Sequence, residues 1–364
     1  MNEEQQLNAI RERIDGLDLE IQNLINERAK CAQEVAHIKQ RGGADGKVFF
    51  YRPEREAQVL RRILDRNAGP LRSEEMARLF REIMSACLAL EQPLHIAFLG
   101  PEGTFTQAAA LKHFGHSVVS MPMGAIDEVF REVESGNAHY GVVPVENSTE
   151  GVVNYTLDMF MNSPLKICGE VEQRIHHHLL SREPGLDRIR RVYSHQQSLA
   201  QCREWLDAHL PGAERIAVSS NAEAARRAAV EESGVAAIAG DLAADRYELP
   251  KLMRNIEDEP DNTTRFLIIG NRSPGPSGSD KTSLLISASN RPGALYRLLD
   301  PLFRHQISMT RIESRPSRRG MWDYVFFIDI LGHAEDVVVS KALMELDEVS
   351  TLLKVLGSYP QAVM

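Results

Sequence analysis

Apolar side chains recur at alternating steps of three and four residues between Leu7 and Lys39. The series runs through Leu7, Ile10, Ile14, Leu17, Ile21, Leu24, Cys31, Val35 and Ile38, and Arg28 holds the one position that is neither apolar nor cysteine. This spacing predicts one amphipathic helix, roughly 50 Å long at ~1.5 Å per residue. Such a helix outreaches the core of a small domain, so its stripe predicts a partner helix and hence a dimer.

The cations of this helix are candidates for anion binding. Arg28 and Lys39 are about 16 Å apart in rise and only ~20° apart around the axis, so their long side chains could hold one small anion. Arg11 is about 26 Å from Arg28, too far to serve the same site from the same chain. Alternatively, Arg28 sets the register of a coiled coil and the other two cations are solvated. The helix alone leaves both interpretations open.

Two shorter helices are predicted after a glycine-rich break at 42–46. The first begins near Pro53 and places Glu56 on the same face as Leu60, and the second runs from Ser73 with Glu91 at the end of its apolar face. Burying an unpaired charge is costly. A cation and two inward-facing acids in one small helical module therefore predict a ligand pocket.

Composition narrows the class of protein. The 364 residues are 43% hydrophobic and 26% charged, without an apolar run near a membrane span's length, which predicts a soluble protein of several domains. The first residues do not resemble a signal peptide, so we expect a cytoplasmic location. Four scattered cysteines favour neither disulfides nor zinc, and a net charge of −9 disfavours nucleic acid.

A second region, 94–270, carries the pattern of an α/β unit. A buried strand at 94–99 runs into a glycine loop and a helix, and later strands end in polar clusters near 147, 194, 221 and 262. Polar residues after strand ends are where open α/β sheets bind ligands. The three consecutive histidines at 176–178 would alternate between faces of a strand, so they predict no metal site.

The last region is separated by composition. Residues 273–279 are rich in serine, proline and glycine, as in a linker. Beyond them the predicted order is strand, helix, strand, strand, helix, strand, the ferredoxin-like α+β arrangement, without a catalytic cluster. The predicted boundaries are 1–92, 94–270, a linker at 271–281, and 282–360.

Residues 1–92 resemble the all-helical chorismate mutase domain, an intertwined dimer of three-helix chains, through the spacing of Arg11, Arg28, Lys39, Glu56 and the final helix. The resemblance implies that Arg28 and the partner's Arg11 hold the two carboxylates of chorismate. It also implies that Lys39 donates to the ether oxygen or a nearby carboxylate and that Glu56 accepts from the ring hydroxyl.

Three positions depart from the commonest pattern of that family. Arg52 stands where some members have an acid, Cys87 where serine is common, and Glu91 where glutamine donates to the ether oxygen. The resemblance places all three at the chorismate site. A carboxylate cannot donate a hydrogen bond, so Glu91 is expected to work only when protonated.

The polar motifs of 94–270 resemble those of prephenate dehydratase, which implies two α/β lobes with the active site in the cleft between them. Thr264 aligns with the catalytic threonine of that family and would donate to the leaving hydroxyl. Asn147, Ser148, Ser194 and Gln201 would bind or polarise prephenate. Arg265 is either a carboxylate anchor or a packing arginine in a salt bridge. Gln196 and Asn221 depart from the usual proline and threonine.

Two segments of the last region resemble the loops by which ACT domains of this family bind phenylalanine between paired domains. The residues implied in that site are Asn290, Pro292, Gly293, Ala294, Leu295, Glu313, Ser314, Arg315 and Pro316. Amide groups at a helix start suit a carboxylate, and Gly293 allows close approach.

The chain is thereby identified as a member of the bifunctional chorismate mutase/prephenate dehydratase family. We expect it to convert chorismate to prephenate and then to phenylpyruvate without a cofactor, as a homodimer or larger assembly inhibited by phenylalanine. Two alternatives stay open. The central region could be a binding module like the two-lobed solute-binding proteins, or the first helices could serve only for dimerisation.

Overall fold

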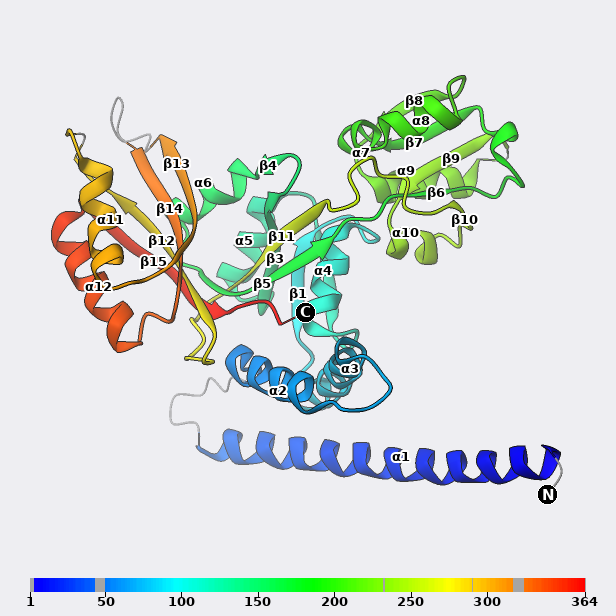
Figure 1. Ribbon diagram of the computed structural model, residues 1–364, viewed down its shortest axis with the longest axis horizontal. Helices are drawn as coiled ribbons and strands as arrows, with labels where there is room; N and C mark the ends of the chain where they lie inside the picture. Colours follow the sequence, from blue (N-terminus) through cyan, green and yellow to red (C-terminus); the bar gives the residue numbers. More distant parts are fainter. Residues whose placement is uncertain (1–2, 43–49, 232, 290, 317–323, 364) are drawn as a thin grey trace.

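The computed structural model describes residues 3–42, 50–231, 233–289, 291–316 and 324–363. These residues form a helical body, a two-lobed α/β body and an α+β body that lie side by side (Figure 1). The predicted fold class is confirmed. Among the described residues, no helix is long and apolar enough to cross a membrane.

The helical body consists of α1 (Glu3–Gly42), α2 (Pro53–Arg66) and α3 (Ser73–Glu91). Helix α1 lies against α3 and extends well beyond it (Figure 1). The apolar stripe of α1 is exposed within the chain, with Leu7 at 47% and Leu24 at 69%. An apolar face of this length left in water is what the periodicity predicted for a helix that pairs with a second copy.

Helix α3 has two buried faces. Ala77 packs with Leu60 and Ile63 of α2 to form the helical core. Arg81 and Ser85 are also buried, and the Ser85 hydroxyl accepts a hydrogen bond from the backbone N–H of Ser117 in the α/β body. The helical body is therefore packed against its neighbour along α3.

The first lobe is a mixed sheet with the strand order β2-β1-β3-β11-β5, and β4 pairs with β3. Its strands are β1 (His95–Leu99), β2 (Val119–Met123), β3 (Tyr140–Asn147), β4 (Gly151–Val152), β5 (Lys166–Arg174) and β11 (Thr263–Gly270). Helices α4 (Phe105–Phe114), α5 (Ile126–Ser135) and α6 (Asn154–Asn162) pack around it. Strand β11 returns antiparallel to both β3 and β5.

The second lobe is inserted between β5 and β11 and has the strand order β10-β6-β9-β7-β8. Its strands are β6 (His178–Leu180), β7 (Arg191–His195), β8 (Glu214–Val218), β9 (Val235–Ala239) and β10 (Lys251–Met253). Its helices are η1 (Leu186–Arg188), α7 (Gln196–Gln201), α8 (Arg203–His209), α9 (Asn221–Val230) and α10 (Asp241–Arg246). The chain crosses between the lobes after β5 and before β11 (Figure 1), and Ile175 and Thr264 near these crossings line a pocket between the lobes.

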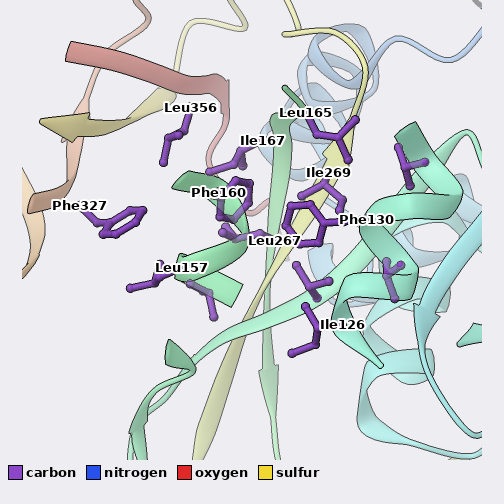
Figure 2. Packing of buried hydrophobic residues seen from close by; sticks show 14 of the residues in the cluster. Ile126, Phe130, Leu157, Phe160, Leu165, Ile167, Leu267, Ile269, Phe327 and Leu356 are labelled. Carbon is purple, nitrogen blue, oxygen red and sulfur yellow. The ribbon is translucent and has the colours of Figure 1, made fainter. Parts of the chain in front are cut away.

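The α+β body has the predicted ferredoxin-like order. It comprises β12 (Asp280–Ser287), α11 (Ala294–Arg304), β13 (Met309–Pro316), β14 (Tyr324–Leu331), α12 (Val337–Val349) and β15 (Leu352–Pro360), with the strand order β13-β14-β12-β15. Its sheet shares a core with the first lobe, where Phe327 and Leu356 join Phe160 and Ile167 (Figure 2). A Cβ atom at Gly357 would lie 2.2 Å from the Ile167 carbonyl oxygen, so this backbone contact requires glycine.

The segment predicted as a linker is held in place. Ser277 is 7% exposed, and Arg61 of α2 donates to the carbonyl oxygens of Ser277 (3.3 Å) and Ser279 (2.7 Å). The same guanidinium reaches the carbonyl oxygen of Gln361 (3.5 Å), and Val363 packs against the core of α2 and α3. Composition alone did not reveal this, because the donors that order the segment come from a distant helix.

Candidate active sites

A pocket of about 450 Å³ lies between α1 and the pair α2 and α3. The charged residues that line it are Arg28, Lys39, Arg52, Arg55, Glu56 and Glu91. The predicted spacing therefore brings Arg28 and Lys39 to one cavity, together with both inward-facing acids. Buried Cys87 also lines it. Cations and acids converge on a space large enough for a small organic anion.

Two further predicted residues are placed differently. Arg11 lies farther along α1 and does not line the pocket; its guanidinium is 3.5 Å from the Asn8 side-chain oxygen. Arg52 reaches the rim of the pocket, where its Nε donates to Glu54 at 2.7 Å and its side chain is 63% exposed. Within one chain the pocket thus receives cations from α1 and from the start of α2, and Arg11 is not among them.

The carboxyl group of Glu56 is buried at the inner wall of the pocket. Burial raises its pKa to about 7, and the guanidinium of Arg81, 3.5 Å away, opposes that rise. Arg81 is a residue that the sequence did not single out, since nothing in its helix period marks it as buried. Its contact with Glu56 gives this acid a charged partner.

The surroundings of Glu91 shift its carboxyl group toward the protonated form. Burial raises the pKa of its carboxyl group, while Lys39 and Arg28 act in the opposite direction. Its Oε2 atom is buried and has no hydrogen-bond partner among the described residues. A protonated carboxyl there has an O–H available for a ligand in the pocket.

A second pocket, of about 230 Å³, lies in the cleft between the two α/β lobes. Thr264 near the start of β11 pairs in register with Asn147 at the end of β3, and both line the cleft. Gln201, Ser198 and Asn221 line it from the second lobe. The predicted Thr264, Asn147 and Gln201 are thereby brought together from separate parts of the chain.

The hydrogen bonds at Asn147 make Thr264 Oγ1 an acceptor and leave its O–H free to donate elsewhere. The Asn147 Oδ1 atom accepts from the backbone N–H groups of Thr149 (3.1 Å) and Glu150 (3.0 Å). Its Nδ2 must then be the donor to Asn262 Oδ1 (2.8 Å) and to Thr264 Oγ1 (2.7 Å). Because Thr264 Oγ1 already accepts a bond, its O–H is left to donate toward the cleft.

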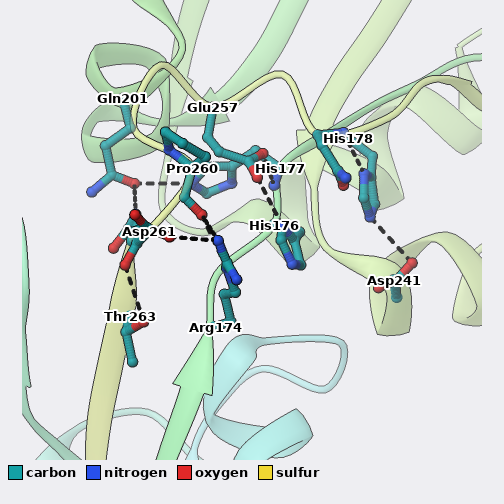
Figure 3. A network of polar contacts seen from close by, with 12 residues as sticks. Arg174, His176, His177, His178, Gln201, Asp241, Glu257, Pro260, Asp261 and Thr263 are labelled. Atoms are coloured by element: carbon teal, nitrogen blue, oxygen red, sulfur yellow. Dashed lines mark hydrogen bonds and ion pairs between the residues drawn. The ribbon is translucent and has the colours of Figure 1, made fainter.

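His177 and Gln201 extend this series of hydrogen bonds. Asn262 Nδ2 donates to Gln201 Oε1 (3.1 Å), which lies 2.9 Å from His177 Nε2 (Figure 3). Burial lowers the pKa of His177, so the ring is neutral and its Nε2 carries the proton that Gln201 accepts. His177 and Asn262 were not among the predicted ligands, although they lie in two segments noted in the sequence, 176–178 and the polar cluster near 262.

The neighbouring histidines face other partners. His176 Nδ1 lies 2.7 Å from Glu257, and His178 Nε2 lies 3.1 Å from Asp241 (Figure 3). Within the described part of the chain, no group of three or more His, Cys, Asp or Glu residues could hold a metal ion. The three rings thus have three separate sets of partners, and alternation along an extended segment accounts for the separation of His177 from its two neighbours.

Ser148 and Ser194 are not among the residues that line the cleft. The Ser148 hydroxyl accepts from the backbone N–H of Thr263 at 3.0 Å. Ser194 is fully buried, with its Oγ 2.9 Å from the Ile238 carbonyl oxygen and 3.0 Å from Asn221 Oδ1. Both hydroxyls hold the backbone and side chains that shape the cleft.

Arg265 follows Thr264 but points away from the cleft, as successive strand residues do. Its guanidinium forms salt bridges with Glu170 (2.9 Å) and Asp329 (2.6 Å) and donates to the Tyr359 hydroxyl (3.0 Å). The structure therefore places it as a packing arginine between the first lobe and the α+β body. Of the two roles left open for Arg265, the salt-bridged packing arginine is the one that these contacts support.

The two segments implied in phenylalanine binding lie on the α+β body. Gly293 precedes α11 with φ 78°, a conformation that favours glycine, and Arg297 donates to the Pro292 carbonyl oxygen at 3.2 Å. Asn290 is outside the described residues. Residues 313–316 belong to edge strand β13 instead of a loop, and Arg315 pairs with Asp158 at 2.7 Å.

Comparison with known proteins adds three family matches along the chain. Residues 10–92 match chorismate mutase type II, 96–274 match prephenate dehydratase, and 282–348 match the ACT domain. Bifunctional chorismate mutase/prephenate dehydratases from Stutzerimonas stutzeri and Pseudomonas aeruginosa are 62% and 60% identical, each over 100% of both chains.

A solved structure resembles the part of the chain after the helical body. Prephenate dehydratase from Arthrobacter aurescens, in complex with L-Phe, is 36% identical with a TM-score of 0.68, and the match covers 74% of this chain and 90% of that one. Full-length similarity, the family matches and the two pockets agree. The chain belongs to the family of bifunctional chorismate mutase/prephenate dehydratases and carries both enzyme activities and an ACT domain.

Proposed function

We propose that the pocket of the helical body binds chorismate and that its charged residues have separate tasks. The rearrangement to prephenate forms no covalent intermediate with the enzyme, so catalysis consists of holding the folded conformer and stabilising charge at the breaking ether bond. Arg28 anchors a carboxylate, Lys39 and protonated Glu91 donate to the ether oxygen, and Glu56 accepts from the ring hydroxyl. Arg52 and Cys87 complete the lining. The convergence of these groups on one cavity carries this proposal.

The second carboxylate is held by the partner's Arg11 in a homodimer. Arg11 lies on α1 outside the lining of its own pocket, in the same stretch of the helix as the exposed apolar residues Ile10 and Ile14. Co-expression of Arg11→Ala and Arg28→Ala chains tests this arrangement. Random pairing should restore about a quarter of wild-type mutase activity, because half the dimers are mixed and each has one intact site of two. Co-expressed chains no more active than either variant alone would contradict a shared site.

In the cleft, Thr264 is the proton donor to the leaving hydroxyl of prephenate. As the C–O bond breaks, the hydroxyl departs as water with the donated proton, and Thr264 regains a proton from solvent water before the next turnover. The C–C bond to the ring carboxylate breaks at the same time, carbon dioxide leaves, and the electron pair completes the aromatic ring. The carrying observation is that Asn147 donates to Thr264 Oγ1 at 2.7 Å, which turns the Thr264 O–H toward the substrate. Gln201 contributes an amide to the cleft, while Ser148 and Ser194 support its walls.

A paired assay tests both sites. Wild-type protein given chorismate should release phenylpyruvate, and Thr264→Ala should consume chorismate at the wild-type rate while prephenate accumulates. If chorismate is not consumed while added prephenate is still converted at the normal rate, the helical body serves only for dimerisation. If Thr264→Ala forms phenylpyruvate at the wild-type rate, this threonine has no role in the reaction.

The ACT domain is proposed to bind phenylalanine between paired copies, at 290–295 and along β13, as the L-Phe complex of the Arthrobacter aurescens relative suggests. Inhibition is then a linkage effect, in which the effector favours one arrangement of the assembly. Phenylalanine added to the paired assay should lower phenylpyruvate formation. We further propose functional units at 1–92, 94–270 and 282–360 in a cytoplasmic homodimer or larger assembly.

A further inference from the structure

Glu56 belongs to the walls of two cavities. One is the large pocket of the helical body, and the other is a cavity of about 30 Å³ where α2, α3, α4, β5 and the segment 360–363 meet. This second cavity, which we call the junction cavity, brings together all three bodies of the protein. The acid proposed to accept from chorismate therefore borders a cavity that residues of the other two bodies also line.

Arg81 occupies the junction side of this wall. It is 7% exposed, and its Nε lies 3.5 Å from Glu56 Oε1. Its Nη1 donates at 2.6 Å to the carbonyl oxygen of Lys112, in the last turn of α4 in the dehydratase. The Nε–H makes no hydrogen bond within the described chain, so its strongest neighbour is the carboxylate. One guanidinium thus connects the mutase acid to the dehydratase backbone.

The other ionisable groups around Glu56 fall on two sides. On the pocket side they are Arg28, Cys31, Lys39, Arg52, Arg55, Cys87 and Glu91, which also face the space for substrate, and Tyr51 lines both sides. On the junction side they are Tyr51, Lys112, His113, Cys168 and Glu170.

Most of the junction groups are neutral or engaged elsewhere. Burial lowers the pKa of His113 to about 3 and raises those of Tyr51 and Cys168. Lys112 Nζ donates to the Glu172 carbonyl oxygen, and Glu170 pairs with Arg265 and Lys281. Arg81 is the junction-side cation that pairs with Glu56.

We infer that Arg81 is a positioning residue of the mutase: it keeps Glu56 ionised and aimed at the ring hydroxyl, and it takes its own position from the dehydratase domain. The inference rests on the proposed role of Glu56. A carboxylate accepts a charge-assisted hydrogen bond, roughly twice as strong as a neutral one, and protonation removes that advantage. Anchoring to the Lys112 carbonyl fixes the guanidinium without adding a second charge. The mutase site is in this sense completed by its neighbour.

The test is the pH dependence of mutase kcat/KM in the full-length protein. Wild-type activity should rise with pH as Glu56 ionises near its pKa of about 7. Arg81→Gln should move this acid limb upward by about one to two pH units, which lowers kcat/KM at pH 7 about five- to fifty-fold. Arg81→Lys keeps a charge and should shift the limb less. Arg78→Gln, an exposed arginine of the same helix, is the matched control and should leave the limb in place.

The remaining variants separate this inference from the proposed role of Glu56. Glu56→Gln should lower kcat/KM and abolish the acid limb; a wild-type profile would defeat the proposed role itself. If Glu56→Gln lowers kcat/KM but Arg81→Gln leaves the acid limb in place, the inference about Arg81 is overturned while the proposed role of Glu56 stands. Dehydratase activity on added prephenate reports whether each variant is folded. If Arg81→Gln fails that check, the double variant Glu56→Gln/Arg81→Gln should match Glu56→Gln, and a further tenfold loss would overturn the inference.

Discussion

The two active sites of this protein use opposite kinds of polar group. The mutase pocket is lined by ionisable side chains, including Arg28, Lys39 and Glu56. The dehydratase cleft is lined at its reacting end by neutral amides and hydroxyls, among them Asn147 and Thr264, joined in a chain of hydrogen bonds with one direction.

The difference follows from the two reactions. A rearrangement that exchanges no proton with the enzyme needs only a preorganised field, which ionised side chains provide. Loss of a hydroxyl needs a proton delivered to one oxygen, and a chain fixed by backbone N–H groups determines which atom donates. In the proposed mechanism, charges set the potential of the first site, and hydrogen-bond direction sets the chemistry of the second.

The largest expected effect comes from reversing the direction of the hydrogen bond between Asn147 and Thr264. Asn147→Asp keeps the shape of the side chain but replaces the Nδ2 donor by an acceptor, so the Thr264 O–H would turn to the new carboxylate. Dehydratase kcat should fall by about 10²–10⁴-fold, the usual contribution of a proton donor. Prephenate turnover measures this, and mutase activity in the same sample is the control. A variant within threefold of wild type would show that the direction is not needed.

An intermediate effect should separate the sites by pH. Mutase kcat/KM should fall about tenfold per pH unit above the raised pKa of Glu91, because the ionised acid cannot donate and repels developing negative charge. Glu91→Gln should remove this alkaline limb, while the dehydratase profile stays the same in both proteins. Identical mutase profiles for wild type and Glu91→Gln would exclude the protonated acid.

A smaller effect tests the contacts that hold the segment near 277–280 against α2. Arg61→Ala removes the donor to the carbonyl oxygens of Ser277, Ser279 and Gln361. Losing charged donors to these carbonyls should cost about 1–3 kcal/mol of local stability. Backbone amides near 277–280 should then exchange with solvent about 5- to 150-fold faster. Arg62→Ala on the same helix is the control, since its guanidinium bonds the Gln58 carbonyl oxygen within α2. Equal exchange in both variants would assign the order of the segment to other contacts.

The elements that the sequence predicted well are those defined by local period. The stripe of α1 and the strand–helix order after residue 280 depend on neighbours a few positions away, and both match the structure. The pocket of Arg28, Lys39, Glu56 and Glu91 followed because helical spacing alone places their side chains on inward faces. The resemblance supplied their expected roles, which remain predictions.

The sequence could not reveal groups whose partners are distant. Arg81 occurs in a helix of ordinary composition, and only folding brings it to Glu56 and to the Lys112 carbonyl. Asn147 and Asn262 are 115 residues apart, so their hydrogen bond has no local signal. Ser194 was predicted as a ligand-binding residue, but it is buried and bonds the backbone. A hydroxyl at a strand end can do either, and the sequence does not show whether the hydroxyl is buried.

The contact between Val363 and the core of α2 and α3 bears on synthesis of the chain. A ribosome completes the helical domain first, yet Gln361, which Arg61 holds, follows that arginine by 300 residues. At about 5–20 residues per second, this interval lasts roughly 15–60 s. The nascent helical domain therefore lacks these contacts throughout that interval. Its packing with 361–363 forms only after the later domains have been synthesised.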